Sequence, residues 1–214
     1  MFNLLKHLPK SFFHSPFAHR GYHDCNGIFK EGKGPENSRR SIIHAIQNGL
    51  GVEIDIRFTK DYIPVVIHDD YLKRLCGVDK YLSNTVYREL SLLKLNNNEN
   101  LPTLEEILGI IDGHTPVLIE FKKLNKTQDL INIKKELYSL LSSYPGPLAL
   151  MSFDMKLIAH FSKMLPNINR GIILEKFDHY RKTFSSSVER MVTEFQIQKN
   201  GISFVSLEYT NLTE

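Results

Sequence analysis

The sequence predicts an α/β fold built on a largely parallel sheet, and its hydrophobic pattern is the basis of that prediction. Strand-like and helix-like segments alternate along the 214 residues, the order that strand–helix–strand units produce. Some strand-like segments, such as 117–119, are unbroken apolar runs, as expected of strands covered on both faces. With 42% hydrophobic residues and no evident linker or repeat, the chain can bury one sizeable core.

The first half is expected to contain a strand at 17–19, a helix at 38–48, strands at 52–58 and 64–67, a loop-rich stretch, and a helix starting at 103. Gly49 is a typical stop residue for the first helix. Thr103 and Glu106 form a capping box, which marks the start of the second helix.

The second half continues the alternation, with strands at 116–121, 147–152, 171–174 and 202–207, and helices at 128–143, 154–165 and 186–199. Asp154 is expected to cap its helix, because an aspartate side chain can accept a hydrogen bond from the first turn. Pro166 is expected to end that helix.

One junction is too short for a parallel connection. Only Thr59 to Ile63 separate the strands at 52–58 and 64–67, whereas a parallel crossover needs about a dozen residues. The second strand should therefore form a hairpin with the first or leave the sheet. Folding about Asp61 places His68 beside Ile54.

Two expected strands carry acidic residues where a buried strand should have none. Alternation places Glu53 and Asp55 on one face of their strand, and Glu120 follows an apolar run on another. Buried carboxylates usually pair with other groups or hold a cation. A solvated face of an antiparallel sheet is the alternative, but the two strands together favour an oxygen-rich site for Mg²⁺ or Ca²⁺.

Other polar groups lie at expected strand ends. His19 ends the first strand and Arg20 follows it, where they form either a surface turn or an acid–base group and a phosphate ligand. Glu36 precedes the first helix, as a complement to its dipole or as a site carboxylate. His68 follows the apolar run of its strand as a surface or a pocket residue.

The bulk composition excludes some classes of protein. A net charge of +3 without a dense basic block does not indicate nucleic-acid binding. Cys25 and Cys76 offer neither metal-ligand spacing nor a disulfide framework. No segment approaches the roughly 20 apolar residues of a membrane span, and the N-terminus lacks the apolar stretch of a signal peptide. We therefore expect a cytoplasmic protein.

In their order along the chain, these segments resemble the glycerophosphodiester phosphodiesterase family. The motifs that carry the resemblance are His19 to Gly21, Pro35 to Ser38, Gly51 to Asp61, Pro64 to Asp69, Pro102 to Glu106, Ile119 to Lys122, and Ser152 to Asp154. The resemblance implies a (β/α)₈ TIM barrel of the phospholipase-C type, with its site at the carboxyl ends of the strands. We expect this barrel at 16–214, after an N-terminal extension at 1–15.

The resemblance also implies roles for individual residues. The divalent metal would be held by carboxylates, with a further one as ligand or neighbour: Glu53, Asp55 and Glu120, and Glu36. The general acid–base pair would be His19 and His68, and the cations that hold the phosphate would be Arg20 and Lys122. Such a site would hydrolyse small-molecule glycerophosphodiesters to glycerol 3-phosphate and an alcohol, a reaction of lipid and glycerol metabolism.

The last part of the family pattern has no counterpart in the sequence. Such barrels usually continue with a further helix and a strand bearing a tryptophan motif, whereas this chain has no Trp. We therefore expect a barrel that lacks its last strand and is open between the strand at 202–207 and the first strand. Exposed apolar edges favour self-association, so we expect a homo-oligomer, a poorly soluble chain, or an edge that a partner covers.

Two alternative functions stay open from the sequence. The chain could be a lysophospholipase-D-like lipid phosphodiesterase, which would need a wide apolar mouth. It could also be a catalytically impaired remnant that serves as a binding or oligomerisation module.

Overall fold

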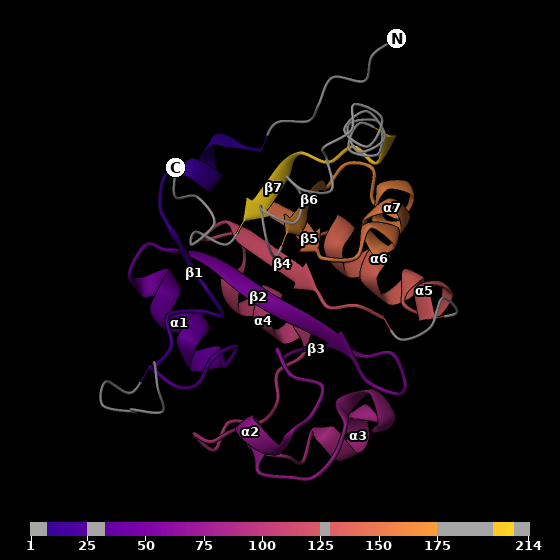
Figure 1. Ribbon diagram of the computed structural model, residues 1–214. Helices are drawn as coiled ribbons and strands as arrows, with labels where there is room; N and C mark the ends of the chain where they lie inside the picture. The colour runs from indigo at the N-terminus through magenta and orange to yellow at the C-terminus, as the bar shows by residue number, and fades with distance from the viewer. Residues whose placement is uncertain (1–7, 25–32, 125–128, 175–198, 208–214) are drawn as a thin grey trace.

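The computed structural model describes residues 8–24, 33–124, 129–174 and 199–207 (Figure 1). They form an α/β fold on a seven-stranded sheet with the order β1-β2-β4-β5-β6-β7, in which β3 pairs with β2 alone. Every pairing is parallel except that of β2 with β3. The predicted α/β class and the largely parallel sheet are confirmed.

The strands start within a few residues of the predicted positions. Their bounds are β1 (Phe17–Ala18), β2 (Gly51–Phe58), β3 (Pro64–Val66), β4 (Val117–Phe121), β5 (Leu148–Ser152), β6 (Asn169–Leu174) and β7 (Phe204–Leu207). Parallel neighbours run in the same direction, so the carboxyl ends of β1, β2 and β4 lie next to one another at the same end of the sheet. Polar side chains that end these strands can therefore meet there.

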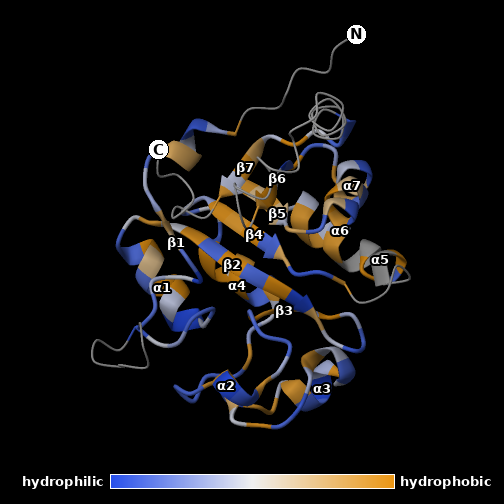
Figure 2. Cartoon of the chain, in the orientation of Figure 1, coloured by the Kyte–Doolittle hydropathy of each residue, from blue (hydrophilic) through white to orange (hydrophobic). Residues whose placement is uncertain are grey.

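The larger helices cover the sheet and bury their apolar faces against it. They are α1 (Arg39–Gln47), α4 (Leu104–Ile111), α6 (Lys134–Ser142) and α7 (Met155–Met164), whereas α5 (Asp129–Asn132) is a single turn with Ile131 65% exposed. Ile42 of α1, Ile107 of α4 and Phe161 of α7 are fully buried in one cluster with the strands. Figure 2 shows the hydrophobic positions concentrated along the central strands. Burial of each such side chain contributes about 1.5–3 kcal/mol.

The predicted helix signals act as expected. The Thr103 side chain accepts a hydrogen bond from the backbone of Glu106, whose side chain accepts one in return, so the capping box is confirmed. Asp154 caps α7 by accepting a hydrogen bond from the Lys156 N–H at 2.9 Å. The helix predicted at 128–143 is two helices instead, because the chain turns at the fully buried Ile133 between α5 and α6.

The segment predicted to be loop-rich contains a small second core. It includes α2 (Lys73–Cys76), the 3-10 helix η3 (Leu82–Asn84) and α3 (Tyr87–Leu90), which lie apart from the main helices in Figure 1. The side chains of this core are Val65, Ile67, Leu72, Leu75, Leu82, Leu90, Leu95 and Leu101. Helices of four residues are too short to show a helical period in the sequence, and the prediction missed them for that reason.

Within the described residues, β1 and β7 are the two edges of the sheet and do not pair with each other. The expected open, partial barrel is therefore confirmed for this part of the chain. Val205 of β7 is 43% exposed, but the oligomeric state stays a prediction. The helix expected at 186–199 lies outside the described residues, except for Lys199.

The end of the predicted N-terminal extension packs against the first strand. The 3-10 helix η1 (Lys10–Phe13) buries Phe12, whose ring stacks on Phe17 with 5.6 Å between the centroids. The division into an extension and a barrel domain stays a prediction. Among the helices that the structure describes, none has the length and apolar composition to cross a membrane.

Candidate active site

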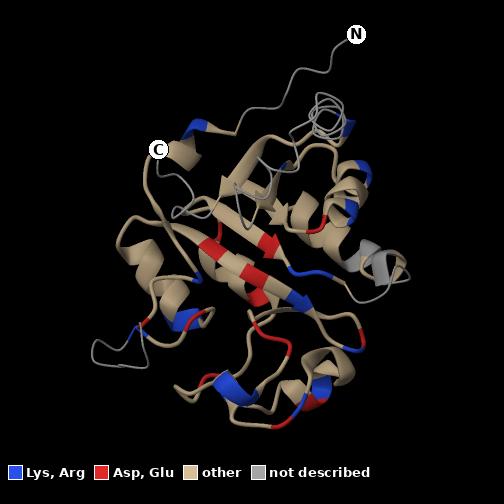
Figure 3. Ribbon diagram, in the orientation of Figure 1, with Lys and Arg blue, Asp and Glu red and all other residues tan. Residues whose placement is uncertain are grey.

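The acidic residues of β2 and β4 converge at the centre of the sheet. Asp55 and Glu120 are direct partners in the parallel pairing, and Glu53 lies two residues earlier on the same face of β2. These three side chains are buried, and each places one oxygen within 4.8 Å of the others. Figure 3 shows the acidic positions side by side on the two strands. The oxygen-rich cluster that the two strands predicted is therefore present.

The acidic cluster is electrostatically unsatisfied. Burial, and then the neighbouring Asp55, raises the pKa of Glu53 to about 8. Burial likewise raises the pKa of Glu120. Glu53 Oε1 is buried and accepts no hydrogen bond within the described structure, and the buried Asp55 Oδ1 has an ion pair with Lys122 but no hydrogen bond. Hard divalent cations prefer carboxylate oxygens, so the donor set and the unpaired Glu53 oxygen fit Mg²⁺ or Ca²⁺.

Lys122, just past the end of β4, lies against this cluster. Its Nζ is 2.7 Å from Asp55 Oδ1 and donates a hydrogen bond to Glu120. Only 11% of the side chain is exposed. The ammonium therefore balances part of the negative charge, and its predicted role toward phosphate stays a prediction.

The loop after β1 brings His19 and Arg20 to the cluster. Ala18 pairs with Val52, so the next residues lie beside Glu53, and the Arg20 N–H donates to Glu53 Oε2 at 2.9 Å. His19 Nε2 lies 4.0 Å from the same oxygen, with 69% of the side chain exposed. Burial of part of the ring, together with the charge of Arg20, lowers the pKa of His19.

This loop requires glycine at position 21. Gly21 has a φ of +78°, and a Cβ there would lie 2.6 Å from Ser41 Oγ on α1. Arg20 also has a left-handed backbone, with a φ of 58°, a conformation that costs energy for a residue with a side chain. The close approach of α1 thus fixes the path of the loop.

The Arg20 side chain connects the cluster to Glu36. Its Nη1 donates to Glu36 Oε1 at 3.0 Å, and its Nε lies 3.2 Å from Asp55 Oδ2. Arg74 also donates to both Glu36 oxygens, at 2.7 and 2.8 Å. Burial alone would raise the pKa of Glu36, but Arg74 and Arg20 lower it overall. Glu36 thus lies beside the cluster as the partner of two arginines.

Asn37 is a site residue that the sequence did not reveal. Its Nδ2 donates to Asp55 Oδ2 at 2.8 Å, and its Oδ1 accepts from the Asp55 N–H at 3.2 Å. The residue is 1% exposed and has a φ of 57°. Asn tolerates this left-handed conformation better than most residues, and Asn37 lies in the motif Pro35 to Ser38, so both were usable signals for it.

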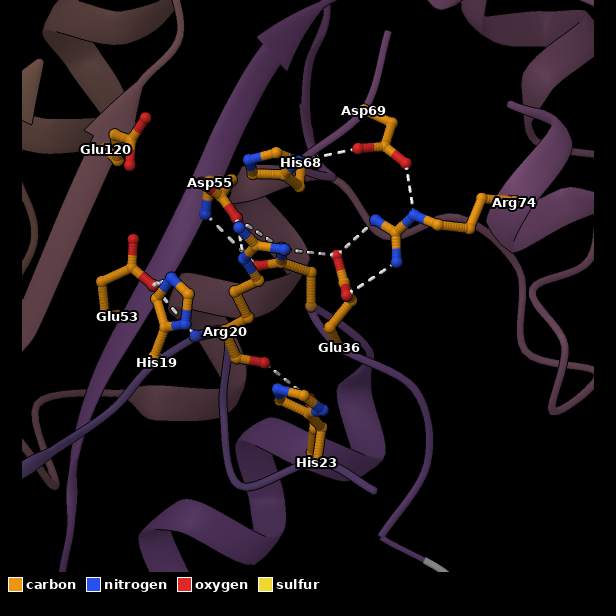
Figure 4. A network of polar contacts seen from close by, with 12 residues as sticks. His19, Arg20, His23, Glu36, Glu53, Asp55, His68, Asp69, Arg74 and Glu120 are labelled. Carbon is orange, nitrogen blue, oxygen red and sulfur yellow. Dashed lines mark hydrogen bonds and ion pairs between the residues drawn. The ribbon is translucent and has the colours of Figure 1, made fainter. Parts of the chain in front are cut away.

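The β2–β3 hairpin delivers His68, as predicted. Ile56 pairs with Val66 in the antiparallel register, and the Ile67 N–H donates to the Asp55 carbonyl at 3.0 Å. Continuing this register places His68 opposite Ile54. Figure 4 shows His68 and His19 on either side of Asp55 and Arg20.

Asp69 and Arg74 hold the His68 ring, and neither was predicted as a site residue. His68 Nδ1 lies 2.7 Å from Asp69 Oδ1, and Arg74 Nε donates to Asp69 Oδ2 at 2.5 Å. Burial alone would raise the pKa of Asp69, but hydrogen bonds from Arg74 and His68 lower it to about 2. The adjacency of Asp69 to His68 was a usable signal, whereas nothing in the sequence links Arg74 to Glu36.

The structure thus brings all of the predicted site residues together at the carboxyl ends of β1, β2 and β4. A buried acidic cluster that fits a cation lies next to two partly exposed imidazoles and two cationic side chains. Such an arrangement can bind an anionic group and transfer protons on both sides of it. The role of each residue stays a prediction.

Residues 19–210 match the Glycerophosphoryl diester phosphodiesterase family. A glycerophosphodiester phosphodiesterase of Bacillus altitudinis is 26% identical over 181 residues, which cover 78% of this chain and 71% of that protein. Human glycerophosphodiester phosphodiesterase 1 is 36% identical over 111 residues, but these cover 47% of this chain and 31% of the human protein.

Solved structures show the same fold. A phosphodiesterase of Oleispira antarctica, solved in complex with the product sn-glycerol-3-phosphate, superposes with a TM-score of 0.74 at 24% identity. The match covers 93% of this chain and 76% of that one. A glycerophosphodiester phosphodiesterase of Parabacteroides distasonis gives a TM-score of 0.65 at 20% identity, over 90% and 92% of the two chains. The predicted barrel type is therefore confirmed, and this chain forms part of it.

Mg²⁺ or Ca²⁺ should raise the melting temperature of the wild-type protein, because a cation relieves repulsion in the acidic cluster of the folded state alone. A ligand at a hundredfold excess over its Kd stabilises by about 2.7 kcal/mol. Thermal denaturation with metal and with chelator measures the rise, which Glu53→Gln or Asp55→Asn should abolish. Glu105→Gln, an exposed change on α4, is the control. An equal rise in all of these variants would contradict the site.

Asp69→Asn should destabilise the protein in a pH-dependent way. The pKa of Asp69 is about 2 in the folded protein, below its usual value of about 3.9. Its contribution to the free energy of unfolding is therefore present above about pH 4 and is lost as pH falls toward about 2.

Urea unfolding of the wild type and of Asp69→Asn at about pH 6 and about pH 3 tests this. The difference between the free energies of unfolding of the wild type and of Asp69→Asn should be up to about 1 kcal/mol for a partly exposed pair, and it should be smaller at the lower pH. Asp79→Asn, an exposed change on the same segment, is the control. A gap that is equal at both values would contradict the assignment.

Proposed function

The chain belongs to the glycerophosphoryl diester phosphodiesterase family, and from that premise we propose that it hydrolyses glycerophosphodiesters to glycerol 3-phosphate and an alcohol. The observation that carries the proposal is the buried cluster of Glu53, Asp55 and Glu120 with His19 and His68 beside it. A phosphodiester is anionic and unreactive, so its hydrolysis needs charge neutralisation, an activated nucleophile and a protonated leaving group. This site offers groups for all three.

Charge neutralisation on the phosphate comes from the cationic side of the site. A divalent cation held by Glu53, Asp55 and Glu120 would supply Lewis-acid stabilisation of the phosphate oxygens. Arg20 offers a guanidinium that Glu36 and Asp55 already orient, and a planar guanidinium suits phosphate oxygens. Lys122 adds a second positive charge beside Asp55.

The two histidines exchange protons with the substrate. One imidazole takes the proton from the attacking hydroxyl, of water or of the glycerol moiety, as the new P–O bond forms. The other gives its proton to the leaving alcohol oxygen as that P–O bond breaks. His68 Nδ1 is directed at Asp69, which leaves Nε2 as the atom that can exchange a proton with substrate.

The proposal is tested by hydrolysis of glycerophosphocholine with Mg²⁺, with Ca²⁺ and with chelator. We expect activity with at least one of the metals and none in chelator, since the cluster needs a cation to bind the phosphate. Glu53→Gln should be inactive, whereas Glu105→Gln should retain activity. Full activity of the wild type in chelator would refute the metal-dependent reaction, and inactivity of a folded, metal-bound wild type would favour the remnant hypothesis.

Alanine at either His19 or His68 should lower turnover by roughly 10² to 10⁴, the usual contribution of one acid–base group. A substrate with a p-nitrophenolate leaving group assigns the two roles, because that group departs without a proton. The variant that lacks the acid should recover most of its loss on this substrate, and the variant that lacks the base should not. His14→Ala, an exposed histidine outside the site, is the control, and equal losses on both substrates would contradict the paired roles.

A further inference from the structure

A cavity of about 470 Å³ adjoins the candidate active site at Lys122. We propose that this cavity receives the alcohol part of the substrate and selects alcohols that carry a negative charge of their own, such as a second phosphate. The inference rests on the proposed function and adds a substrate class to it.

The cavity shares Lys122 with the candidate active site. Its wall includes the end of β2, the hairpin loop after it, the loop after β4, and the segment around residue 83. Lys122 lies in this wall and also contacts Asp55. Arg57, in the same wall, donates from its Nε to the His68 carbonyl at 2.5 Å. One arm of a phosphodiester held between the histidines can therefore extend into the cavity.

The wall carries an excess of positive charge. Its cationic side chains are Arg57, Lys60, Lys122 and Lys123, and its one carboxylate is Asp70. The Asp70 oxygens accept hydrogen bonds from Ser83 N and Ser83 Oγ at 2.9 and 2.8 Å. The hydrogen-bond partner of Asp70 is therefore Ser83 and not a lysine of the wall. Figure 3 shows basic positions at the end of β2 and on the loop after β4.

Among the residues that the structure describes, most of these cations have no acidic partner. Lys122 is paired with Asp55 and Glu120. In the part of the chain that the structure describes, no carboxylate forms an ion pair with Arg57, Lys60 or Lys123. Unpaired cations around a concave wall attract an anionic group and disfavour a cationic one.

The charge of the cavity can discriminate only through the alcohol. The glycerol arm is neutral and common to all glycerophosphodiesters, whereas the alcohol arm varies in charge. An alcohol with its own phosphate would meet Lys60 and Lys123, and a quaternary ammonium such as choline would be repelled by them. Lys60 and Lys123 would therefore determine which alcohol is preferred without taking part in the hydrolysis.

The test compares glycerophosphoinositol with glycerophosphoinositol 4-phosphate, which differ by one phosphate on the same ring. We expect a higher kcat/KM for the 4-phosphate, with a preference that falls as salt is added. Lys60→Gln and Lys123→Gln should each reduce the ratio of the two kcat/KM values by about two- to fivefold, the range of one exposed ion pair. Lys163→Gln, an exposed change on α7, should leave the ratio unchanged.

The outcomes separate the inference from the proposed function. If the enzyme hydrolyses glycerophosphoinositol as well as or better than its 4-phosphate, the inference is overturned and the proposed function stands. A ratio that neither lysine variant changes also overturns the inference. If the metal-loaded protein hydrolyses glycerophosphocholine but neither inositol compound, the inference is overturned and the proposed function stands, whereas failure on all three compounds overturns both.

Discussion

The register of two parallel strands is the constraint on which this site depends. Because Asp55 and Glu120 are direct partners across β2 and β4, their carboxylates meet in the sheet interior, and the pleat adds Glu53 to the same face. Buried carboxylates so close together destabilise one another when they are charged. Burial and this repulsion together raise the pKa of Glu53 to about 8. The groups that surround the cluster are cations or hydrogen-bond donors, because only these lower that cost.

The carboxylates of the cluster need hydrogen-bond donors, and this accounts for the left-handed backbone of two residues beside it. Arg20 and Asn37 both adopt a left-handed conformation, at a cost of about 1 kcal/mol or more each. In return, the Arg20 N–H reaches Glu53 and the Asn37 amide reaches Asp55. Hydrogen bonds to carboxylates are stronger than those between neutral groups, so the strain and the contacts belong together. Sequence motifs at these two turns therefore encode geometry as well as chemistry.

The sequence revealed those parts of the site that local rules determine. The short connection before Pro64 excluded a parallel crossover and left either a hairpin or a strand outside the sheet. The hairpin alternative, which the structure shows, places His68 beside β2. The acidic alternation of β2 indicated the cluster, although the resemblance supplied the roles. The contact of Arg74 with Glu36 could not be predicted, since it joins residues 38 positions apart through the fold of the second core. That core was itself hidden, because its helices are too short to show a period.

The same long-range contact joins the two halves of the site. A chain of ion pairs and hydrogen bonds runs from His68 through Asp69, Arg74, Glu36 and Arg20 to Asp55. Arg74 therefore orients the carboxylate that holds His68 and the carboxylate that holds Arg20. Groups joined in this way respond together rather than independently. The small second core thus has a defined part in the site, because it carries the arginine that aligns an imidazole on one strand end with a guanidinium on another.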